Sequence, residues 1–187
     1  MVAKILDAAR LELQEMGVVD FTTKKVADRA GISPGSLYQY IPDKHALLIN
    51  IQLDELRYMH LLAESCFNAS DQTRFTRLRS FVILSLRYQC KNAALHEALR
   101  DAAPFYRDSI HVKDALEGYQ GTLYYFLSPL LPGMTKERHN MAIKAMTTMI
   151  QTTGAEFAHA TRKPDEMDMF ADFVVDMIEA YVGQLRS

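Results

Sequence analysis

The stretch FTTKKVADRAGISPGSLYQYIPDK, residues 21–44 of the 187-residue chain, decides the fold of the N-terminal part. Its helix-capping and helix-ending residues predict two very short helices joined by a tight turn. Thr22 or Thr23 can cap the first helix with a hydroxyl, and Gly31 supplies the left-handed conformation that ends it. Ser33 is then a suitable N-cap for the second helix. The spacing of these capping residues therefore predicts a pair of helices packed across a turn.

The second helix of this pair has one apolar and one polar side. Pro34 is tolerated at its first position, because the N–H missing from proline would have no helical partner there. Leu37 and Ile41 lie four residues apart and point inward. The side chains that remain outside this inner face are Ser36, Tyr38, Gln39 and Tyr40. A two-turn helix that presents hydroxyls, a phenol and an amide is typical of a helix-turn-helix, whose second helix enters the major groove of DNA.

Two side chains in this stretch suit DNA in particular. The amide of Gln39 can pair with N6 and N7 of adenine, so it is the best candidate for reading a base. Lys44 follows the expected N-cap Asp43 and places a positive charge at the start of the next helix. That placement opposes the helix dipole unless an anion docks there. A DNA phosphate would supply this anion.

The charge balance gives weight to an alternative interpretation. The formal charge of the chain is −2, which excludes a generally polycationic nucleic-acid binder. Residues 1–45 contain six basic and six acidic residues, so this part carries no net charge either. A plain helical hairpin with a polar exposed face would look the same by this measure. DNA binding must therefore come from a local arrangement of side chains.

The motifs around this stretch match a known family. They are Ile5-Leu6-Asp7-Ala8-Ala9, Gly17, Phe21-Thr22-Thr23, Val26-Ala27, Ala30-Gly31-Ile32-Ser33, Gly35-Ser36-Leu37-Tyr38, Tyr40, Lys44 and Leu47. With them, residues 5–48 strongly resemble the DNA-binding domain of the TetR family of bacterial transcriptional regulators. The run from Ala30 to Lys44 is the most specific part of this resemblance. The remainder of the chain fits the family in the number and length of its helices.

The resemblance implies an all-helical homodimer that binds a palindromic operator on double-stranded DNA and is released by a small-molecule effector. An activator would grip the operator in the same way as a repressor, and we expect a repressor. Carried over by position, the residues that hold the DNA backbone are Thr22, Thr23, Tyr38 and Lys44. Those that face the groove are Ser33, Pro34, Gly35, Ser36, Gln39 and Tyr40. Lys24 completes the expected DNA-binding set.

The sequence departs from the family pattern at two places. Many members begin with a basic arm before the first helix, whereas this chain starts with Met1-Val2-Ala3-Lys4. Either the arm is absent or the numbering starts after it, so the sequence leaves additional minor-groove contacts open. Ile41-Pro42 stands where an aromatic and a small polar residue are common, and we expect this pair to alter the turn into the next helix.

The fold class predicted for the whole chain is all-α. Neither Gly nor Pro occurs between Pro42 and Pro104, and no stretch keeps the alternation of a strand. About nine helices are expected, near residues 2–16, 23–30, 34–41, 44–66, 72–91, 94–102, 106–127, 136–161 and 166–185. We expect residues 1–45 to form a three-helix DNA-binding domain. Residues 46–187 are expected to form a larger domain for ligand binding and dimerisation.

The last two helices are apolar over more than one face. In the final helix apolar pairs recur every four residues, from Met169/Phe170 to Tyr181/Val182, and Asp165 is the expected N-cap. An ordinary core would explain this pattern, but methionine-rich faces also suit adaptable contacts with a second copy. We favour a dimer interface, and the residues predicted for it are Met141, Ala145, Met149, Phe157, Phe170, Phe173, Val174, Met177 and Tyr181.

An effector pocket is expected among the helices that span residues 46–150. Aromatic, polar and histidine side chains are frequent there, and a mainly apolar pocket with a few hydroxyls suits a lipophilic or aromatic molecule. Each of these residues taken alone is more often core or surface than ligand contact. The residues predicted for the pocket are Met59, Ser85, Tyr88, Gln89, His96, Phe105, Tyr106, His111, Tyr119 and Thr122.

Other functions find little support in the sequence. The longest apolar run is far shorter than a membrane span, acidic residues interrupt the N-terminus where a secretion signal would lie, and we expect a cytoplasmic protein. No catalytic triad, phosphate loop or metal-ligand spacing is present, so neither a metal nor a cofactor is expected, nor is enzyme activity. Two alternatives remain: a dimeric helical adaptor or ligand-binding protein without DNA binding, and a helical enzyme that uses the effector cavity.

Overall fold

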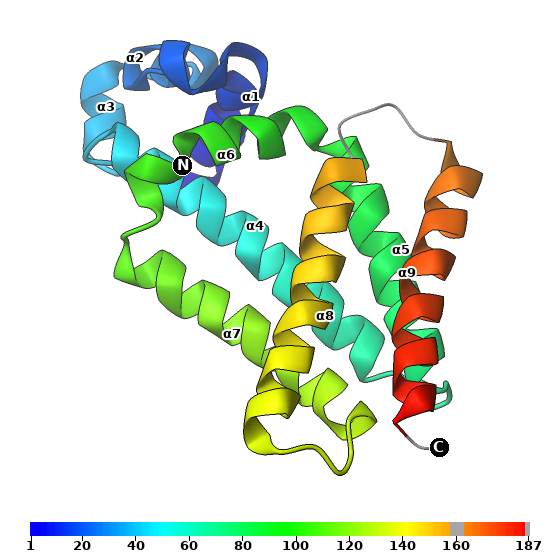
Figure 1. The fold of residues 1–187 in the computed structure, drawn as a ribbon. Helices are drawn as coiled ribbons and strands as arrows, with labels where there is room; N and C mark the ends of the chain where they lie inside the picture. The colour runs from blue at the N-terminus through cyan, green and yellow to red at the C-terminus, as the bar shows by residue number, and fades with distance from the viewer. Residues whose placement is uncertain (158–162, 186–187) are drawn as a thin grey trace. The chain divides into compact units, whose positions relative to one another are not determined.

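The computed structural model describes residues 1–157 and 163–185, and the prediction of an all-α fold is confirmed (Figure 1). Every regular element in these residues is helical. The helices are α1 (Val2–Asp20), α2 (Thr23–Ala30), α3 (Pro34–Tyr38), α4 (Lys44–Phe67), α5 (Arg74–Lys91), α6 (Ala93–Tyr106), α7 (Ile110–Leu127), the 3-10 turn η1 (Ser128–Leu130), α8 (Lys136–Phe157) and α9 (Pro164–Gln184).

The chain forms two compact units. The first contains Met1–Arg57 and Ala94–Leu116, and the second contains Tyr58–Ala93 together with the described residues from Glu117 onward. Helices α4 and α7 therefore contribute residues to both units. A functional boundary after residue 45 stays a prediction.

The core of the first unit is built from the inward faces of α1–α4 and α6. Phe21, Leu13 and Leu37 are fully buried there, and Leu95 of α6 joins them. The expected inward direction of Leu37 and Ile41 is confirmed. Full burial of a large apolar side chain contributes about 1.5–3 kcal/mol, so these residues fix the short helices that could not persist alone.

Helix α1 breaks where the sequence predicts that it should end. Gly17 has φ 68° and ψ 175°, a backbone conformation that favours glycine, although Val18–Asp20 resume helical geometry beyond it. The prediction for α6 was wrong, since it continues through Pro104 to Tyr106. The loss of one backbone hydrogen bond at Pro104 is offset by the burial of Tyr106, whose hydroxyl donates to the carbonyl of Leu99 over 2.8 Å.

Two further expectations about helix ends were wrong. Helix α3 ends at Tyr38 and not at residue 41, with Gln39 as its C-cap residue. Helix α9 has Lys163 and not Asp165 as its N-cap, because Pro164 occupies the first helical position. The carboxylate of Glu166 accepts a hydrogen bond from the backbone N–H of Lys163 over 3.0 Å. The expected end of α8 at residue 161 lies outside the described residues.

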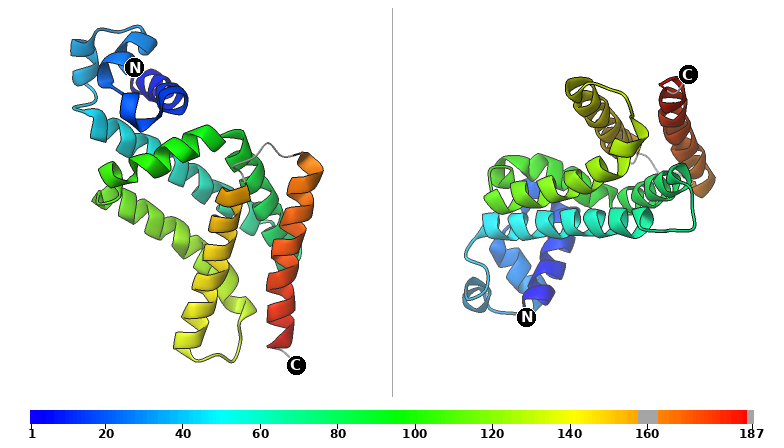
Figure 2. Two further views of the ribbon diagram at one scale, coloured as in Figure 1. Left: turned by 45° about the horizontal axis from the view of Figure 1, so that its top comes forward. Right: turned by 90° about the horizontal axis from the view of Figure 1, so that it is seen from below.

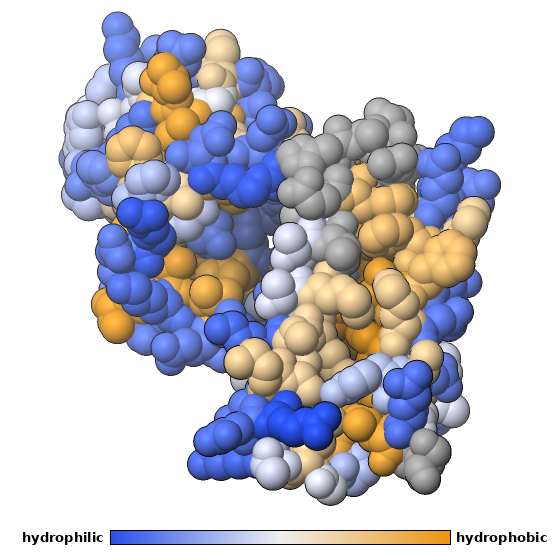
Figure 3. Space-filling view, viewed as in Figure 1, coloured by the Kyte–Doolittle hydropathy of each residue, from blue (hydrophilic) through white to orange (hydrophobic). Residues whose placement is uncertain are grey.

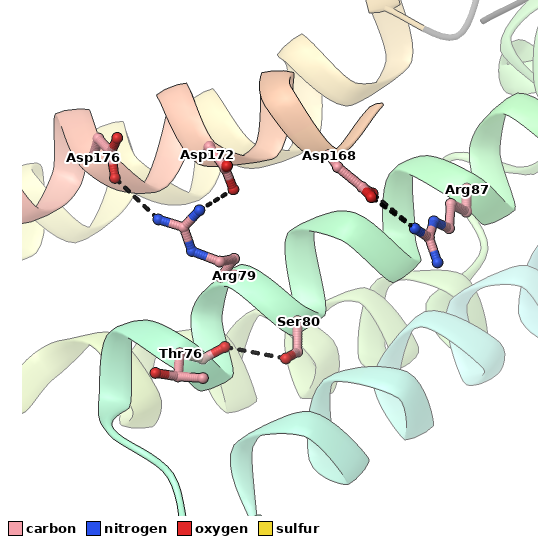
Figure 4. A network of polar contacts seen from close by, with 7 residues as sticks. All are labelled: Thr76, Arg79, Ser80, Arg87, Asp168, Asp172 and Asp176. Atoms are coloured by element: carbon pink, nitrogen blue, oxygen red, sulfur yellow. Dashed lines mark hydrogen bonds and ion pairs between the residues drawn. The ribbon is translucent and has the colours of Figure 1, made fainter. Parts of the chain in front are cut away.

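In the second unit, α9 packs along α5, and ion pairs fix its rotation (Figure 4). Arg79 of α5 pairs with Asp172 and, over 3.1 Å, with Asp176, while Arg87 pairs with Asp168 over 2.8 Å. The three aspartates recur every four residues, so they form one stripe along α9. Because this stripe faces the arginines of α5, the apolar residues of α9 lie on its other sides.

The core of the second unit joins α4, α5, α7, α8 and α9. Its largest fully buried side chains include Phe81, Leu78, Leu86 and Leu123. Helices α8 and α9 run antiparallel beside each other in all the views (Figures 1 and 2). Ala171, Val175 and the second member of most apolar pairs in α9 are buried in this core.

Candidate nucleic-acid interface

Helices α2 and α3 are capped at the residues that the sequence singles out. The hydroxyl of Thr22 accepts a hydrogen bond from the N–H of Lys25 over 3.3 Å, which settles the choice between Thr22 and Thr23 as N-cap. Gly31 ends α2 with φ 65° and ψ 38°. The hydroxyl of Ser33 accepts from the N–H of Ser36 over 3.1 Å and starts α3. These local bonds set the two helices across the turn.

The polar side of α3 is open to solvent. Tyr38 is 52% exposed, and Gln39 and Tyr40 are also exposed. The hydroxyl of Tyr38 lies 2.9 Å from that of Thr23, which ties the end of α3 to the start of α2. Ser33, Pro34 and Gly35 are exposed as well, whereas Ser36 is half-buried. The structure thus brings the predicted groove-facing residues onto one short helix and its two flanks.

Packing within the chain does not require a glycine at position 35. A Cβ atom at this position would meet only the Ser33 hydroxyl oxygen, at an ordinary 3.8 Å. Its backbone also lies outside the positive-φ conformations that favour glycine. Close approach of another molecule is a common reason for a glycine of this kind.

Lys44 has a different environment from the one expected. Its ammonium group is half-buried and donates to the carbonyl of Val18 over 2.7 Å, and it lies 5.8 Å from the ring centre of Phe21. The backbone near Val18 leaves the helical path at Gly17, so its carbonyl needs a partner from elsewhere. Lys44 supplies that partner and keeps two further N–H donors. Asp43 caps α4 as expected, accepting from the N–H of Ala46 over 2.8 Å.

The neutral net charge of the N-terminal part conceals an uneven distribution. Arg29 donates to the buried carboxylate of Glu12 over 2.8 Å and to Glu15 over 3.0 Å, so its single positive charge is shared by two carboxylates between α1 and α2. The hydrogen bonds from Arg29 hold the pKa of Glu15 below its ordinary value. The eleven residues predicted to contact DNA include two lysines and no acidic residue. Of the two, Lys24 is fully available on the surface and pairs with no carboxylate among the described residues.

The residues predicted for an effector pocket are divided between the two units. Tyr106 and His96 belong to the first unit, where His96 approaches the carboxylate of Glu55 over 2.8 Å. Phe105 and His111 are exposed in the same unit. Their partners within the chain identify His96 and Tyr106 as parts of the packed structure of that unit.

The other six lie in the second unit, and several of them also have partners there. Tyr88 stacks on Tyr58 at 3.9 Å between ring centres, and the Ser85 hydroxyl donates to the Val82 carbonyl over 2.9 Å. Burial raises the pKa of Tyr119 to about 12, so this phenol stays protonated near neutral pH. The remaining members are Met59, Gln89 and Thr122. An effector site built from them stays a prediction.

The first member of each apolar pair in α9 faces solvent. Met169, Phe173 and Met177 are exposed, whereas Val174 is buried in the core of the unit. A groove of about 470 Å³ lies between α8 and the part of α9 that begins at Met177. Figure 3 shows that the surface over α8 and α9 is largely hydrophobic. Other predicted interface residues that line the groove are Met141, Ala145, Met149 and Tyr181. Phe157 and Phe170 are half-buried and stack on each other at 4.2 Å.

Sequence reasoning missed two features of the second unit. Met169 extends the exposed apolar face by one turn, and the repeat of apolar pairs was a sufficient signal to include it. A second pocket, of about 350 Å³, contains Arg74 and Arg77. The available signal was a first helical turn that carries arginines and no acidic residue.

None of the helices in residues 1–157 and 163–185 combines the length and apolar character that a membrane span requires. Within the same residues, no three acidic, histidine or cysteine side chains gather as a metal ion would need. Cys66 and Cys90 form no disulfide.

Helix α1 with the two short helices α2 and α3, of which α3 is exposed on its polar side and capped by Ser33, defines a helix-turn-helix protein of the DNA-binding class. Residues 5–51 match the family model described as bacterial regulatory proteins of the tetR family, and residues 73–185 match that of the tetracyclin repressor-like C-terminal domain. The chain therefore belongs to the TetR family of transcriptional regulators. A search of curated protein sequences finds no match.

Solved structures share the fold over nearly the whole chain. The fatty acid degradation regulator FadR from Bacillus halodurans has a TM-score of 0.72 at 16% identity, covering 95% of this chain and 97% of that one. PfmR from Thermus thermophilus has a TM-score of 0.71 at 17% identity, covering 92% and 97%. FadR from Bacillus subtilis, in complex with stearoyl-CoA, has a TM-score of 0.69 at 18% identity, covering 95% and 97%. At these identities the likeness establishes the fold.

Proposed function

We propose that this regulator is a dimeric repressor that binds a palindromic operator and leaves it when a small-molecule effector binds. The observation that carries this proposal is the exposed polar side of α3, joined to α2 by the bond between Tyr38 and Thr23. Family membership supports the role in transcription. A regulator of this kind is proposed to act in the cytoplasm and to catalyse no reaction.

The proposed DNA contacts follow from the positions of the polar atoms. Exposed hydroxyls of Thr22 and Ser33 lie at two helix N-termini and can donate to phosphates beside the backbone N–H groups. Gln39 reads a base edge, and Gly35 leaves room for the DNA backbone or a base to approach. Lys44 steadies the end of α1 and can donate to a phosphate with its remaining hydrogens.

The dimer is proposed to form through the exposed apolar sides of α8 and α9. A contiguous hydrophobic surface on a single chain favours association, and the same surface on two copies can pack about a two-fold axis. Two recognition helices about 34–36 Å apart would then reach successive major grooves on one side of the DNA. A palindrome with half-sites one helical turn apart is the operator that fits this arrangement.

The effector is proposed to act by favouring a state with a different spacing of the two recognition helices. A coupling of about 1–3 kcal/mol would weaken operator binding roughly 5–150-fold. The stearoyl-CoA bound to FadR from Bacillus subtilis supports a small organic effector for this fold. Activation in place of repression would show as increased transcription from the operator on addition of the protein.

Gln39→Ala and Tyr38→Phe are expected to affect DNA binding in different ways. Loss of the Gln39 amide should relax preference at one base pair by about 1–3 kcal/mol and leave the others unchanged. Loss of the Tyr38 hydroxyl should weaken all sequences alike, by about 0.5–1.5 kcal/mol. Competition binding against single-base variants of the operator measures both. A uniform loss for Gln39→Ala would contradict its role in base readout.

Lys24→Ala is expected to lower the salt dependence of DNA binding. If Lys24 neutralises one phosphate, the slope of log K against log salt concentration should become less steep by about 0.9 in each half-site. Fluorescence anisotropy at several salt concentrations measures the slope. Lys136→Ala, at the exposed start of α8, is the matched control and should leave the slope unchanged. Equal slopes for Lys24→Ala and the unmodified protein would remove Lys24 from the interface.

The operator itself can be found by selecting bound fragments from sheared genomic DNA. The purified protein should enrich a palindrome, and the selection should lose it when Gln39 and Lys24 are both replaced by alanine. Ligand-free protein, prepared by unfolding and refolding, serves as the second arm because a co-purified effector would hold the released state. Absence of enrichment in both arms would refute DNA binding and favour an adaptor.

A further inference from the structure

A pocket of about 350 Å³ lies within the second unit, beside the hydrophobic core. It is open to solvent and is lined by the end of α4, the first turns of α5 and the last turns of α7. Two arginines of α5, Arg74 and Arg77, line it together with Thr122, Tyr125 and Phe126 of α7. This pocket is separate from the DNA-binding residues and from the groove between α8 and α9.

The two guanidinium groups are held in place by the protein. Arg74 donates to the carbonyl of Phe126 and Arg77 to the carbonyl of Phe67, each over 2.7 Å. Both guanidinium carbons lie near the face of the Phe126 ring, at 5.2 and 5.8 Å from its centre. Phe126 in turn stacks on Phe67 at 3.7 Å, so the platform under the arginines is itself packed. The cations are therefore positioned before any ligand arrives.

Neither of these arginines has an acidic partner among the described residues. Arg79 and Arg87, further along the same helix, both pair with aspartates of α9. The carboxylate that lines the pocket, Glu64, lies 3.6 Å from the ring nitrogen Nε2 of His60. The Nε atom of Arg77 is buried and has no hydrogen-bond partner in the described part of the chain. A buried donor without a partner is destabilising, so a ligand oxygen or water there would be stabilising.

The helix adds to this positive potential. The 18-residue helix α5 directs its N-terminus, where a partial positive charge resides, toward the end that carries Arg74 and Arg77. Its first turn contains no acidic residue. Two cations at the positive end of a helix oppose its stability unless an anion is bound nearby.

We propose that this pocket binds a small organic anion through its carboxylate or phosphate group. The anionic oxygens accept hydrogen bonds from Arg74 and Arg77, whose guanidinium geometry suits both groups. The body of the ligand lies against Tyr125, which lines the pocket and is exposed. The role of this pocket as an effector site rests on the proposed function, whereas the binding of an organic anion to it does not.

Calorimetry on the full chain tests the proposal with three probes that share a phenyl ring. Benzoate and phenyl phosphate carry the two anionic groups, and benzamide is their neutral counterpart. We expect both anions to bind at millimolar concentration or better and benzamide to bind at least about tenfold more weakly. Equal binding of benzamide would overturn the requirement for charge. Inorganic phosphate that binds as tightly as phenyl phosphate would overturn the assignment of an organic ligand.

Variants of α5 locate the binding. Arg77→Gln and, as a second variant, Arg74→Gln should each weaken benzoate binding by about tenfold or more. Arg87→Gln removes a positive charge from the same helix at a residue paired with Asp168, and it should leave benzoate binding unchanged. Thermal melting confirms that each variant is folded. Equal affinities in all three variants would refute the pocket.

The effect on DNA is measured separately by adding benzoate to the complex of protein and operator. Since calorimetry requires no DNA, failure to bind an operator would refute the proposed function and leave the pocket assignment intact. Loss of benzoate binding only in the pocket variants, with operator binding retained, would support both.

Discussion

Replacement of Phe173 by aspartate is expected to leave a folded monomer of 21.3 kDa that no longer binds a palindrome tightly. Phe173 is 61% exposed in the single chain, at the centre of the apolar side of α9. In a dimer formed through this side, the aspartate would lose water without gaining a partner. Near a two-fold axis it would also meet its own copy, because the same residue occurs on both surfaces. An uncompensated buried charge costs several kcal/mol, which is enough to separate the subunits.

The Phe173→Asp variant should remain folded, because the contacts that hold α9 in the second unit lie on other sides of the helix. The aspartates 168, 172 and 176 pair with arginines of α5, and Val174, Ile178 and Val182 fill the core. Leu61→Asp places the same charge at an exposed apolar residue of α4 in the same unit and is the matched control. Sedimentation equilibrium should show a monomer for Phe173→Asp and a dimer for Leu61→Asp.

The consequence for DNA follows from the number of half-sites that one particle can engage. A dimer binds the second half-site as an intramolecular event, which raises the overall affinity about 10²–10⁴-fold. The monomer should lose this factor and bind a palindrome no better than a single half-site. A monomeric unmodified protein, or a Phe173→Asp variant that remains dimeric, would exclude the proposed interface.

The parts of this structure that the sequence predicts best are those decided by neighbouring residues. Thr22, Gly31 and Ser33 act through bonds that span three or four positions, so the bounds of α2 and the start of α3 could be predicted. The pairs in α9 predict two apolar sides because the helical period fixes which residues share a side. In the structure, the first members face solvent and most of the second members face the core.

Long-range partners could not be predicted in this way. His96 was a candidate for the effector pocket, but it meets Glu55, which lies 41 positions away in the sequence. Lys44 was expected to face an anion, but the carbonyl exposed by the break at Gly17 accepts from it 26 positions away. No pocket was predicted at Arg74 and Arg77, because residues of α4 and α7 that lie far from them in the sequence complete its lining. The type and spacing of residues in the sequence do not determine such long-range contacts.

Glu55→Ala is expected to destabilise the first unit by about 3–5 kcal/mol. The side chain of Glu55 is only 7% exposed, and its carboxylate accepts from Arg10 of α1 and lies 2.8 Å from Nε2 of His96 in α6. The substitution removes the negative charge through which α4 contacts both α1 and α6. The guanidinium of Arg10 then loses its ion pair with Glu55. Urea unfolding monitored by circular dichroism should show a lower midpoint at an unchanged slope.

A matched acidic residue one position away provides the control for this prediction. Asp54 pairs with Arg57 over 3.4 Å, and the Arg57 side chain is 72% exposed, so Asp54→Ala should cost no more than about 1 kcal/mol. The double variant Arg10→Ala with Glu55→Ala should lose less than the sum of the single variants, by about 1–3 kcal/mol, because the first replacement already removes the contact. Additive losses, or equal costs for Glu55→Ala and Asp54→Ala, would show that the buried ion pair does not hold α1 against α4. Subadditive losses would instead establish that the helix bearing Arg10, the first of the DNA-binding unit, is anchored by a charge buried in α4.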